Sequence, residues 1–85
     1  MIPTKICGIT RTEDAKVAIK NGASALGFIF YNKSPRYITI KEAVSISKNI
    51  SNSASRVGVF VNHDQGFINN AIKDIPLDMI QLHGE

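Results

Sequence analysis

Residues 25–31 read Ala-Leu-Gly-Phe-Ile-Phe-Tyr, an unbroken run without a charged side chain. The run is too short for a helix and rich in aromatic residues, which favours a strand buried on both faces. Residues 56–61 read Arg-Val-Gly-Val-Phe-Val and repeat the pattern almost throughout. Such strands are typical of parallel sheets, so the two runs predict a parallel α/β fold. Gly27 and Gly58 within them indicate close approach of the backbone.

Shorter segments on either side complete an alternation of strands and helices. The predicted elements are a strand at residues 4–7, a helix at about 11–21, the strand at 25–31, a loop at 32–39, a helix to about residue 50, a polar linker at 51–55, the strand at 56–61, a helix ending before Pro76 and a strand at 77–83. Strands joined by helical crossovers run parallel, because each crossover returns the chain to the same end of the sheet. All strand exits therefore share one face of the molecule, which binds ligands in open α/β sheets and in barrels.

Cap residues and apolar stripes support the helices. The capping pattern, an N-cap side chain with Glu or Gln three positions later, occurs at Thr10 with Glu13, Thr39 with Glu42 and Asn62 with Gln65. Gly22 suits the left-handed residue that ends the first helix. The expected core positions are Ala15, Ala18, Ile19 and Ala23 in the first helix, Ala43, Ile46, Ser47 and Ile50 in the second, and Phe67, Ile68, Ala71, Ile72 and Ile75 in the third.

The composition is that of one small globular domain. The 85 residues contain no apolar stretch long enough to span a bilayer and no secretory signal pattern, so we expect a cytoplasmic protein without a membrane partner. The net charge of +3 is mild and the ten Lys and Arg are dispersed, which argues against nucleic-acid binding. The single cysteine forms no internal disulfide and lacks a nearby Cys or His for a metal site.

Cys7 ends the first predicted strand, directly before Gly8 and the start of the first helix. A thiol at a strand exit that faces a helix N-terminus is suited to act as a base or nucleophile. Lys5, on the same face of the strand, would supply part of the favourable charge. The alternative is a small buried apolar residue without a chemical role.

Arg36 lies in Ser34-Pro35-Arg36, in the loop after the second strand. An arginine held beside a proline in an exit loop suits bidentate capture of a carboxylate or phosphate. The alternative is a solvated surface arginine. The chain has neither a Walker loop nor a spaced glycine fingerprint for binding phosphate.

Gln81 and His83 lie on one face of the last strand, opposite Ile80 and Leu82. If the sheet curves, that face is the inside of a barrel, where the two side chains could hydrogen-bond a substrate or position a base. The alternative for His83 is a capping or loop histidine. The segment Asn62-His63-Asp64 at the third strand exit is interpreted as helix capping.

Four segments carry a wider resemblance: Lys5-Ile6-Cys7-Gly8-Ile9-Thr10, Gly27-Phe28-Ile29-Phe30 with Ser34-Pro35-Arg36, Val57-Gly58-Val59-Phe60-Val61-Asn62, and Leu77-Asp78-Met79-Ile80-Gln81-Leu82-His83-Gly84. In their order and spacing, they closely resemble the phosphoribosylanthranilate isomerase family of tryptophan biosynthesis. The resemblance covers essentially the whole chain. It implies that residues 1–85 are the N-terminal half of a (β/α)8 TIM barrel, with strands one to four and helices one to three.

The resemblance also implies an activity, an Amadori rearrangement without cofactor or metal. It converts N-(5-phosphoribosyl)anthranilate into 1-(2-carboxyphenylamino)-1-deoxyribulose 5-phosphate. In the family, a general acid opens the ribose ring to a Schiff base and a general base removes the proton on the neighbouring carbon. Cys7 matches the base, Arg36 matches the arginine expected to hold the anthranilate carboxylate, and His83 lies where the family lines its active site.

By the same resemblance, the general acid is an aspartate of the family's second half, and loops after strands seven and eight hold the phosphate. Neither occurs in these residues, so we expect the 85-residue chain alone to be an inactive fragment. Its first and fourth strands would expose unpaired edges and its inner face would be open to water. Self-association could close the sheet, or the chain could flatten. The alternatives are another phosphosugar-handling barrel and a non-catalytic half-barrel that serves as an assembly or binding module.

Overall fold

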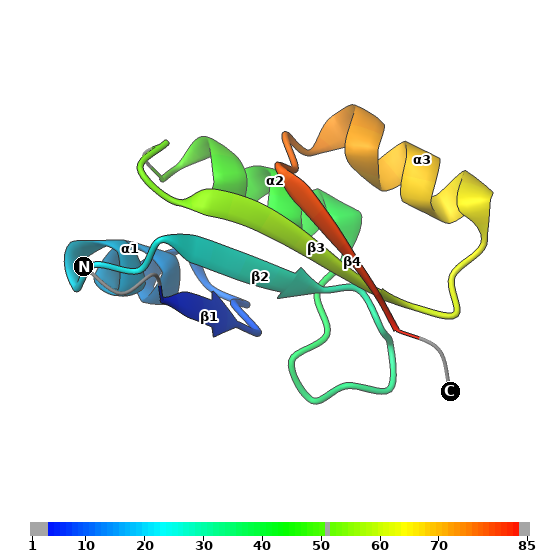
Figure 1. Cartoon of the computed structure of the whole chain (residues 1–85), viewed down its shortest axis with the longest axis horizontal. Helices are drawn as coiled ribbons and strands as arrows, with labels where there is room; N and C mark the ends of the chain where they lie inside the picture. Colours follow the sequence, from blue (N-terminus) through cyan, green and yellow to red (C-terminus); the bar gives the residue numbers. More distant parts are fainter. Residues whose placement is uncertain (1–3, 51, 84–85) are drawn as a thin grey trace.

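The computed structural model describes residues 4–50 and 52–83, which form a four-stranded parallel sheet with helices between the strands (Figure 1). The elements are β1 (Lys5–Cys7), α1 (Thr12–Lys20), β2 (Ala25–Ile29), α2 (Ile40–Lys48), β3 (Ser55–Val61), α3 (Gln65–Asp74) and β4 (Met79–His83). The strand order is β1-β2-β3-β4, which confirms the predicted alternation. Residue 51 of the expected linker and Gly84 of the fourth segment lie outside the described residues.

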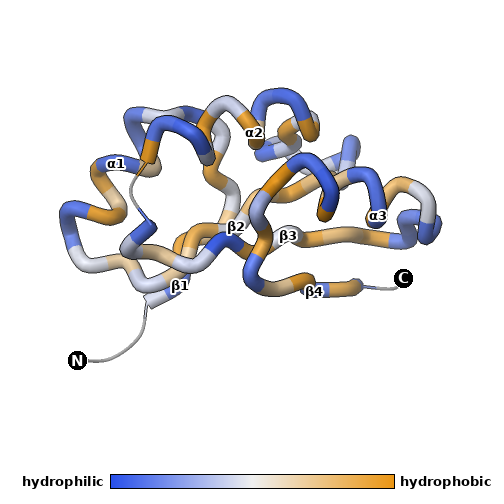
Figure 2. Tube along the Cα trace, turned by 90° about the horizontal axis from the view of Figure 1, so that it is seen from above, coloured by the Kyte–Doolittle hydropathy of each residue, from blue (hydrophilic) through white to orange (hydrophobic). Residues whose placement is uncertain are grey.

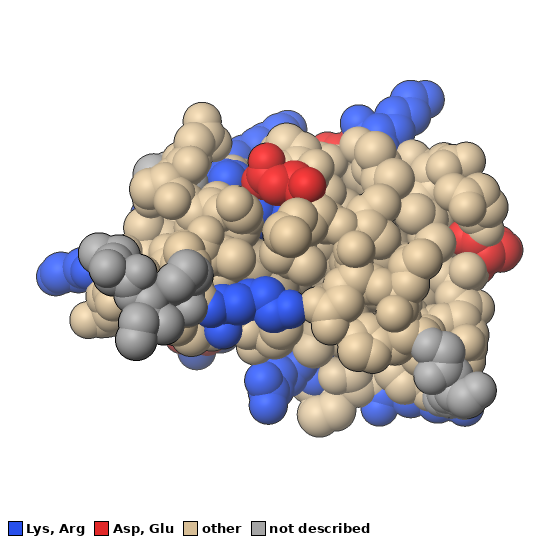
Figure 3. Space-filling model, viewed as in Figure 1, with Lys and Arg blue, Asp and Glu red and all other residues tan. Residues whose placement is uncertain are grey.

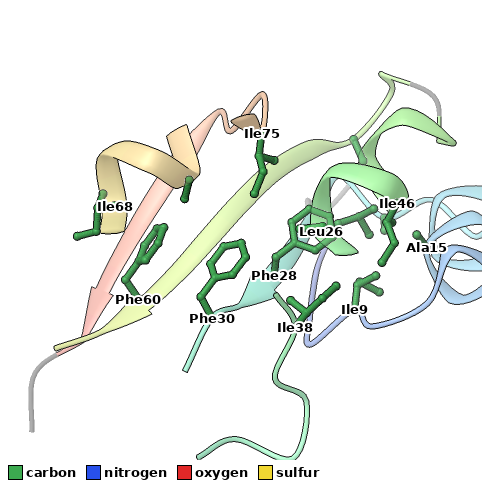
Figure 4. Close-up of a cluster of buried hydrophobic side chains, with 14 residues drawn as sticks. Ile9, Ala15, Leu26, Phe28, Phe30, Ile38, Ile46, Phe60, Ile68 and Ile75 are labelled. Carbon is green, nitrogen blue, oxygen red and sulfur yellow. The ribbon is translucent and has the colours of Figure 1, made fainter. Parts of the chain in front are cut away.

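The helices α1, α2 and α3 all cover one face of the sheet (Figure 2). The core lies beneath them, where Phe28, Phe30 and Phe60 point from the sheet toward the helices (Figure 4) and are at most 1% exposed. Side chains alternate along each strand, so Cys7 and its register partner Gly27 belong to the opposite face. We call this the helix-free face, a name that refers to the described residues alone.

The core is predicted well, with two exceptions. β3 is buried on both faces as expected, whereas Ala25 and Ile29 of β2 are only half-buried on the helix-free face. Ile72 of α3 is 44% exposed and does not belong to the core. No helix within residues 4–50 and 52–83 is long and apolar enough to cross a membrane.

The cap predicted at Thr10 is wrong. α1 begins at Thr12 and its N-cap is Arg11, whose extended backbone carries no side-chain cap. The late start makes Glu13 the second helical residue, and its carboxylate pairs with the Arg11 guanidinium at 2.7 Å. Both side chains are well exposed, so the ion pair contributes little to stability.

The cap predicted at Asn62 with Gln65 is also wrong. The N-cap of α3 is Asp64, whose carboxylate accepts a hydrogen bond of 2.8 Å from the Phe67 amide. Asn62 precedes the helix with a φ of 55°, a left-handed conformation that asparagine tolerates better than most residues.

The capping box predicted at the start of α2 is confirmed. The Glu42 amide donates to Thr39 Oγ1 at 3.1 Å, and the Thr39 amide donates to Glu42 Oε1 at 3.0 Å. The hydrogen bond from the Thr39 backbone, followed by that from its hydroxyl, holds the pKa of the Glu42 carboxyl below its usual range. A lowered pKa stabilises the fold above the unfolded-state pKa, and this contribution is lost as the pH falls through the folded-state pKa.

We expect Thr39→Ala to lower the free energy of unfolding by about 1 kcal/mol, as for other lost N-caps. Glu42→Gln should remove the part of the acid sensitivity below about pH 4.3 that this carboxyl contributes. Urea unfolding across the acidic range measures both effects. Lys41→Ala, in the same helical turn, serves as the control, and equal stability of the Thr39 and Lys41 variants would contradict the role of the box.

Candidate functional site

Cys7 lies half-buried at the C-terminal end of β1, on the helix-free face. A Cβ placed on Gly27 of the adjacent strand would stand 2.9 Å from Cys7 Sγ, so any larger residue at position 27 would press on the thiol. This confirms the close approach predicted at Gly27. α1 packs on the opposite face of the sheet, and Gly27 of β2 is a close neighbour of the thiol.

Arg36 is brought to the exit of β1 by the loop that follows β2. The Arg36 amide donates to Ser34 Oγ at 3.1 Å, and the Tyr37 amide donates to the Ser34 carbonyl at 3.1 Å, which folds the loop into a turn. The guanidinium crosses Gly8 and its Nη1 donates to the Cys7 carbonyl at 3.2 Å. Arg36 is therefore exposed yet held against the backbone of Cys7, while the Lys5 ammonium donates to Gln81.

Gly8 leaves the space that the Arg36 side chain occupies. A Cβ on Gly8 would lie 2.2 Å from Arg36 Cδ, and the φ of Gly8 is +84°. Gly22 has a similar φ of +92° but an added Cβ would meet nothing within 4 Å. Substitutions at the two glycines therefore distinguish the effect of backbone strain, which both share, from the effect of a contact with Arg36, which only Gly8 has.

We expect Gly8→Ala and Gly22→Ala each to cost about 1–2 kcal/mol for a left-handed non-glycine residue. Only Gly8→Ala should also displace Arg36. Urea unfolding measures the first effect, and the side-chain NMR resonances of Arg36 measure the second. An Arg36 signal that stays unchanged in Gly8→Ala would contradict the placement of the guanidinium over Gly8.

A hydrogen-bonded chain of three side chains spans the helix-free face. Lys5 Nζ donates to Gln81 Oε1 at 2.5 Å, and Gln81 Nε2 lies 2.6 Å from His83 Nε2. Gln81 and His83 therefore share a face as predicted. The Lys5 side chain crosses from β1 to β4 over the two central strands, where Val57 and Val59 are only 3% and 8% exposed. The expectation that the inner face is open to water is therefore wrong at its centre.

His63 ties the ends of β2 and β3 together, a role that sequence reasoning missed. The Val61 amide donates to His63 Nδ1 at 3.0 Å, and His63 Nε2 lies 3.0 Å from the Phe30 carbonyl. The ring also stacks on Phe67 with centroids 4.6 Å apart. Of the three residues assigned to capping, Asp64 caps α3 and His63 joins two strand ends.

Metal ions and nucleic acids are two other classes of ligand that the sequence analysis considered. Within residues 4–50 and 52–83, no three His, Cys, Asp or Glu side chains group closely enough to hold a metal ion. Figure 3 shows Lys and Arg at several separate places on the visible surface, as expected for a dispersed positive charge. The candidate site comprises the helix-free face and the strand exits that border it, with Cys7, Arg36 and the Lys5–Gln81–His83 chain.

Comparison with known proteins gives matches over the whole chain. Residues 4–85 match the family described as N-(5'-phosphoribosyl)anthranilate (PRA) isomerase. The chain is 45% identical over 85 residues to N-(5'-phosphoribosyl)anthranilate isomerase of Geobacter sulfurreducens, covering 100% of this chain and 42% of that protein. It thus spans about two fifths of the length of such curated relatives.

Solved structures of phosphoribosylanthranilate isomerases are similar to this chain over its whole length. A crystal structure of phosphoribosyl anthranilate isomerase in complex with reduced 1-(o-carboxyphenylamino)-1-deoxyribulose 5-phosphate has a TM-score of 0.94 and 46% identity, covering 100% of this chain and 44% of that one. The Thermotoga maritima enzyme also gives a TM-score of 0.94 at 46% identity, covering 100% of this chain and 42% of that one. These matches confirm the predicted fold, the N-terminal half of a (β/α)8 barrel.

Proposed function

The chain belongs to the N-(5'-phosphoribosyl)anthranilate isomerase family, and from this premise we propose that its helix-free face forms part of an active site for that isomerisation. In this proposal Arg36 binds the anthranilate carboxylate, Cys7 is the base, and Gln81 and His83 hydrogen-bond the substrate. The observation that carries the proposal is the 3.2 Å contact of Arg36 Nη1 with the Cys7 carbonyl. This contact supports the proposal because it brings a guanidinium, a group suited to binding a carboxylate, from the loop after β2 to the residue at the end of β1.

The proposed chemistry follows from these positions. A guanidinium has five N–H donors in a planar fork, so one contact to the Cys7 carbonyl leaves others for a carboxylate. With the anthranilate end anchored by Arg36, the Cys7 thiolate takes the proton from the carbon next to the imine. The C–H electron pair forms a C=C double bond while the C=N pair of the protonated imine returns to nitrogen, and the resulting enolamine tautomerises to the ketone of the product.

We further propose that the 85 residues alone do not complete this reaction. By resemblance to the family, the acid that opens the ribose ring and the loops that hold the phosphate have no counterpart in them. Loss of general acid catalysis alone typically lowers a rate by about 10²–10⁴-fold. The cytoplasmic location expected from the sequence stays a proposal alongside the activity.

Ligand mapping by NMR tests the site. The probes are reduced 1-(o-carboxyphenylamino)-1-deoxyribulose 5-phosphate, which one relative binds, and its parts, anthranilate and ribose 5-phosphate. We expect the whole ligand and anthranilate to shift the signals of Cys7, Arg36 and His83, and to leave Lys16 of the exposed α1 surface unchanged. Shifts with ribose 5-phosphate but not anthranilate would instead support another phosphosugar-handling barrel. No shift at Cys7 or Arg36 with any probe would contradict the proposed site.

A second candidate, an assembly module without catalysis, is favoured by the two sheet edges. Beside β1 lies a hollow of about 210 Å³ lined by Ile6, Val17 and Ala18 among others, while Leu82 of the β4 edge is 68% exposed. Unpaired parallel edges with apolar side chains are ready to pair with another chain.

If the edges pair between copies, sedimentation should show a dimer that dissociates on dilution and is lost in Leu82→Lys. Ser45→Lys, which adds the same charge at an exposed position of α2, is the matched control. A monomer at every concentration would contradict self-association and leave the isomerase proposal unaffected.

A further inference from the structure

We propose that Lys5 is a positioning residue that acts through Gln81 to place the proton of the neutral His83 imidazole on Nδ1. His83 then offers the substrate a hydrogen-bond donor and does not act as the base. The role toward a substrate rests on the proposed function. The arrangement of Lys5, Gln81 and His83 is independent of the proposed function.

Donor and acceptor rules fix the direction of the chain. A lysine ammonium can only donate, so the Gln81 atom that it contacts at 2.5 Å must be the carbonyl Oε1. The amide nitrogen of Gln81 is thereby turned toward His83, where it lies 2.6 Å from Nε2. An amide NH₂ also only donates, so Nε2 must accept and the proton of the neutral ring lies on Nδ1.

The contact between Lys5 and Gln81 depends on the shape of the sheet. The paired registers set Lys5 level with Ala25, and Gln81 level with Val59 and Ile29, so the two are separated by two intervening strands and by four residues along them. In a flat sheet this separation would be about 14 Å across and about 13 Å along the strands. The sheet therefore curls toward the helix-free face, and the contact between Lys5 and Gln81 forms because of that curvature.

The charge of Lys5 strengthens the chain. A hydrogen bond from an ionised donor is about twice as strong as one between neutral groups. The Lys5 ammonium also polarises the Gln81 amide, which strengthens the hydrogen bond from its NH₂ group to His83. Among the described residues, the Gln81 side chain hydrogen-bonds with Lys5 and His83 alone, so without Lys5 its amide could turn over and present oxygen to His83. Within residues 4–50 and 52–83, His83 Nδ1 makes no hydrogen bond, so its proton remains available for the carboxylate, phosphate or hydroxyl oxygens of a phosphoribosyl substrate.

The other histidine, His63, has the opposite tautomer and therefore serves as an internal reference. His63 Nδ1 accepts from the Val61 amide, so the proton of its neutral ring lies on Nε2 and is donated to the Phe30 carbonyl. The protein contains two histidines in all. Their imidazole signals should therefore show opposite patterns in one spectrum.

Long-range ¹H–¹⁵N NMR of the 85-residue chain, at a pH where imidazole is neutral, tests the assignment. We expect His83 with protonated Nδ1 and bare Nε2, and His63 with the reverse. In Lys5→Met, and more fully in Gln81→Glu, whose carboxylate only accepts, the His83 proton should move to Nε2 while His63 stays unchanged. Lys16→Met should change neither ring.

His83 protonated on Nε2 in the unmodified chain would overturn the proposal, as would a His83 proton that stays on Nδ1 in both variants. If Lys5→Met alone fails to fold, Gln81→Glu keeps the size of the side chain and decides the question. The measurement uses no substrate and no turnover. A missing isomerase activity would therefore leave it standing, and a different tautomer would leave Cys7 and Arg36 in their proposed roles.

Discussion

Cys7→Ala is expected to lower kcat by about 10²-fold or more in a barrel completed with the remaining β/α units of a relative, because loss of a general base typically has an effect of that size. KM should change little, since the thiol lies over Gly27 and the carboxylate is assigned to Arg36. Steady-state kinetics with the phosphoribosyl anthranilate substrate measure both constants.

Arg36→Lys is the matched variant for this prediction. Lysine keeps the charge but loses the bidentate fork, so the change should appear chiefly as a raised KM. Alkylation gives independent evidence, because Cys7 is the single cysteine in these residues. Iodoacetamide should abolish the activity that this half confers, and bound product analogue should slow the modification. Full activity of Cys7→Ala would remove the thiol from the mechanism.

Arg56→Met is expected to lower the free energy of unfolding by about 2–4 kcal/mol, since buried polar groups left without partners cost about 1–3 kcal/mol each. Arg56 is only 4% exposed. Its guanidinium donates to Ser47 Oγ at 2.6 Å and to the carbonyls of Ser47 at 3.0 Å, Ala54 at 3.3 Å and Ile50 at 3.4 Å. These bonds satisfy the C-terminal end of α2 and fasten it to β3.

The control for Arg56 is Arg11→Met, which removes an arginine that is exposed in its ion pair with Glu13. Exposed pairs contribute at most about 1 kcal/mol, so Arg11→Met should leave stability nearly unchanged. Since small domains have about 5–15 kcal/mol of stability in total, the two variants should be easily distinguished by urea unfolding. Equal losses would show that the bonds to α2 do not stabilise the fold.

The fold was accessible from the sequence because its signals are local. The runs at residues 25–31 and 56–61 predicted buried parallel strands, and Thr39 with Glu42 predicted a cap that forms as expected. The same capping pattern failed at Thr10, since spacing alone does not fix where a helix begins. The helix begins after Arg11 instead, so Glu13 is the second helical residue and not the third, which a capping box requires.

The site was accessible only in part, because its contacts join residues far apart in the chain. Strand alternation placed Gln81 and His83 together, but nothing local indicates that Lys5 reaches Gln81 across two strands. Arg56 was interpreted as the first residue of a strand, although a basic residue that begins a buried apolar strand signals a buried hydrogen-bonding partner. His63 was missed for a similar reason, since its acceptor, the Phe30 carbonyl just after β2, is 33 residues away.

The most direct test of the proposed half-site is turnover after mixing. The 85-residue chain, the remaining β/α units of a relative, and an equimolar mixture of the two are each assayed for conversion of N-(5-phosphoribosyl)anthranilate. We predict that only the mixture forms 1-(2-carboxyphenylamino)-1-deoxyribulose 5-phosphate, and that it does so only with Cys7 intact. Conversion by the 85-residue chain alone, or no conversion by a mixture that sedimentation shows to be assembled, would contradict the account.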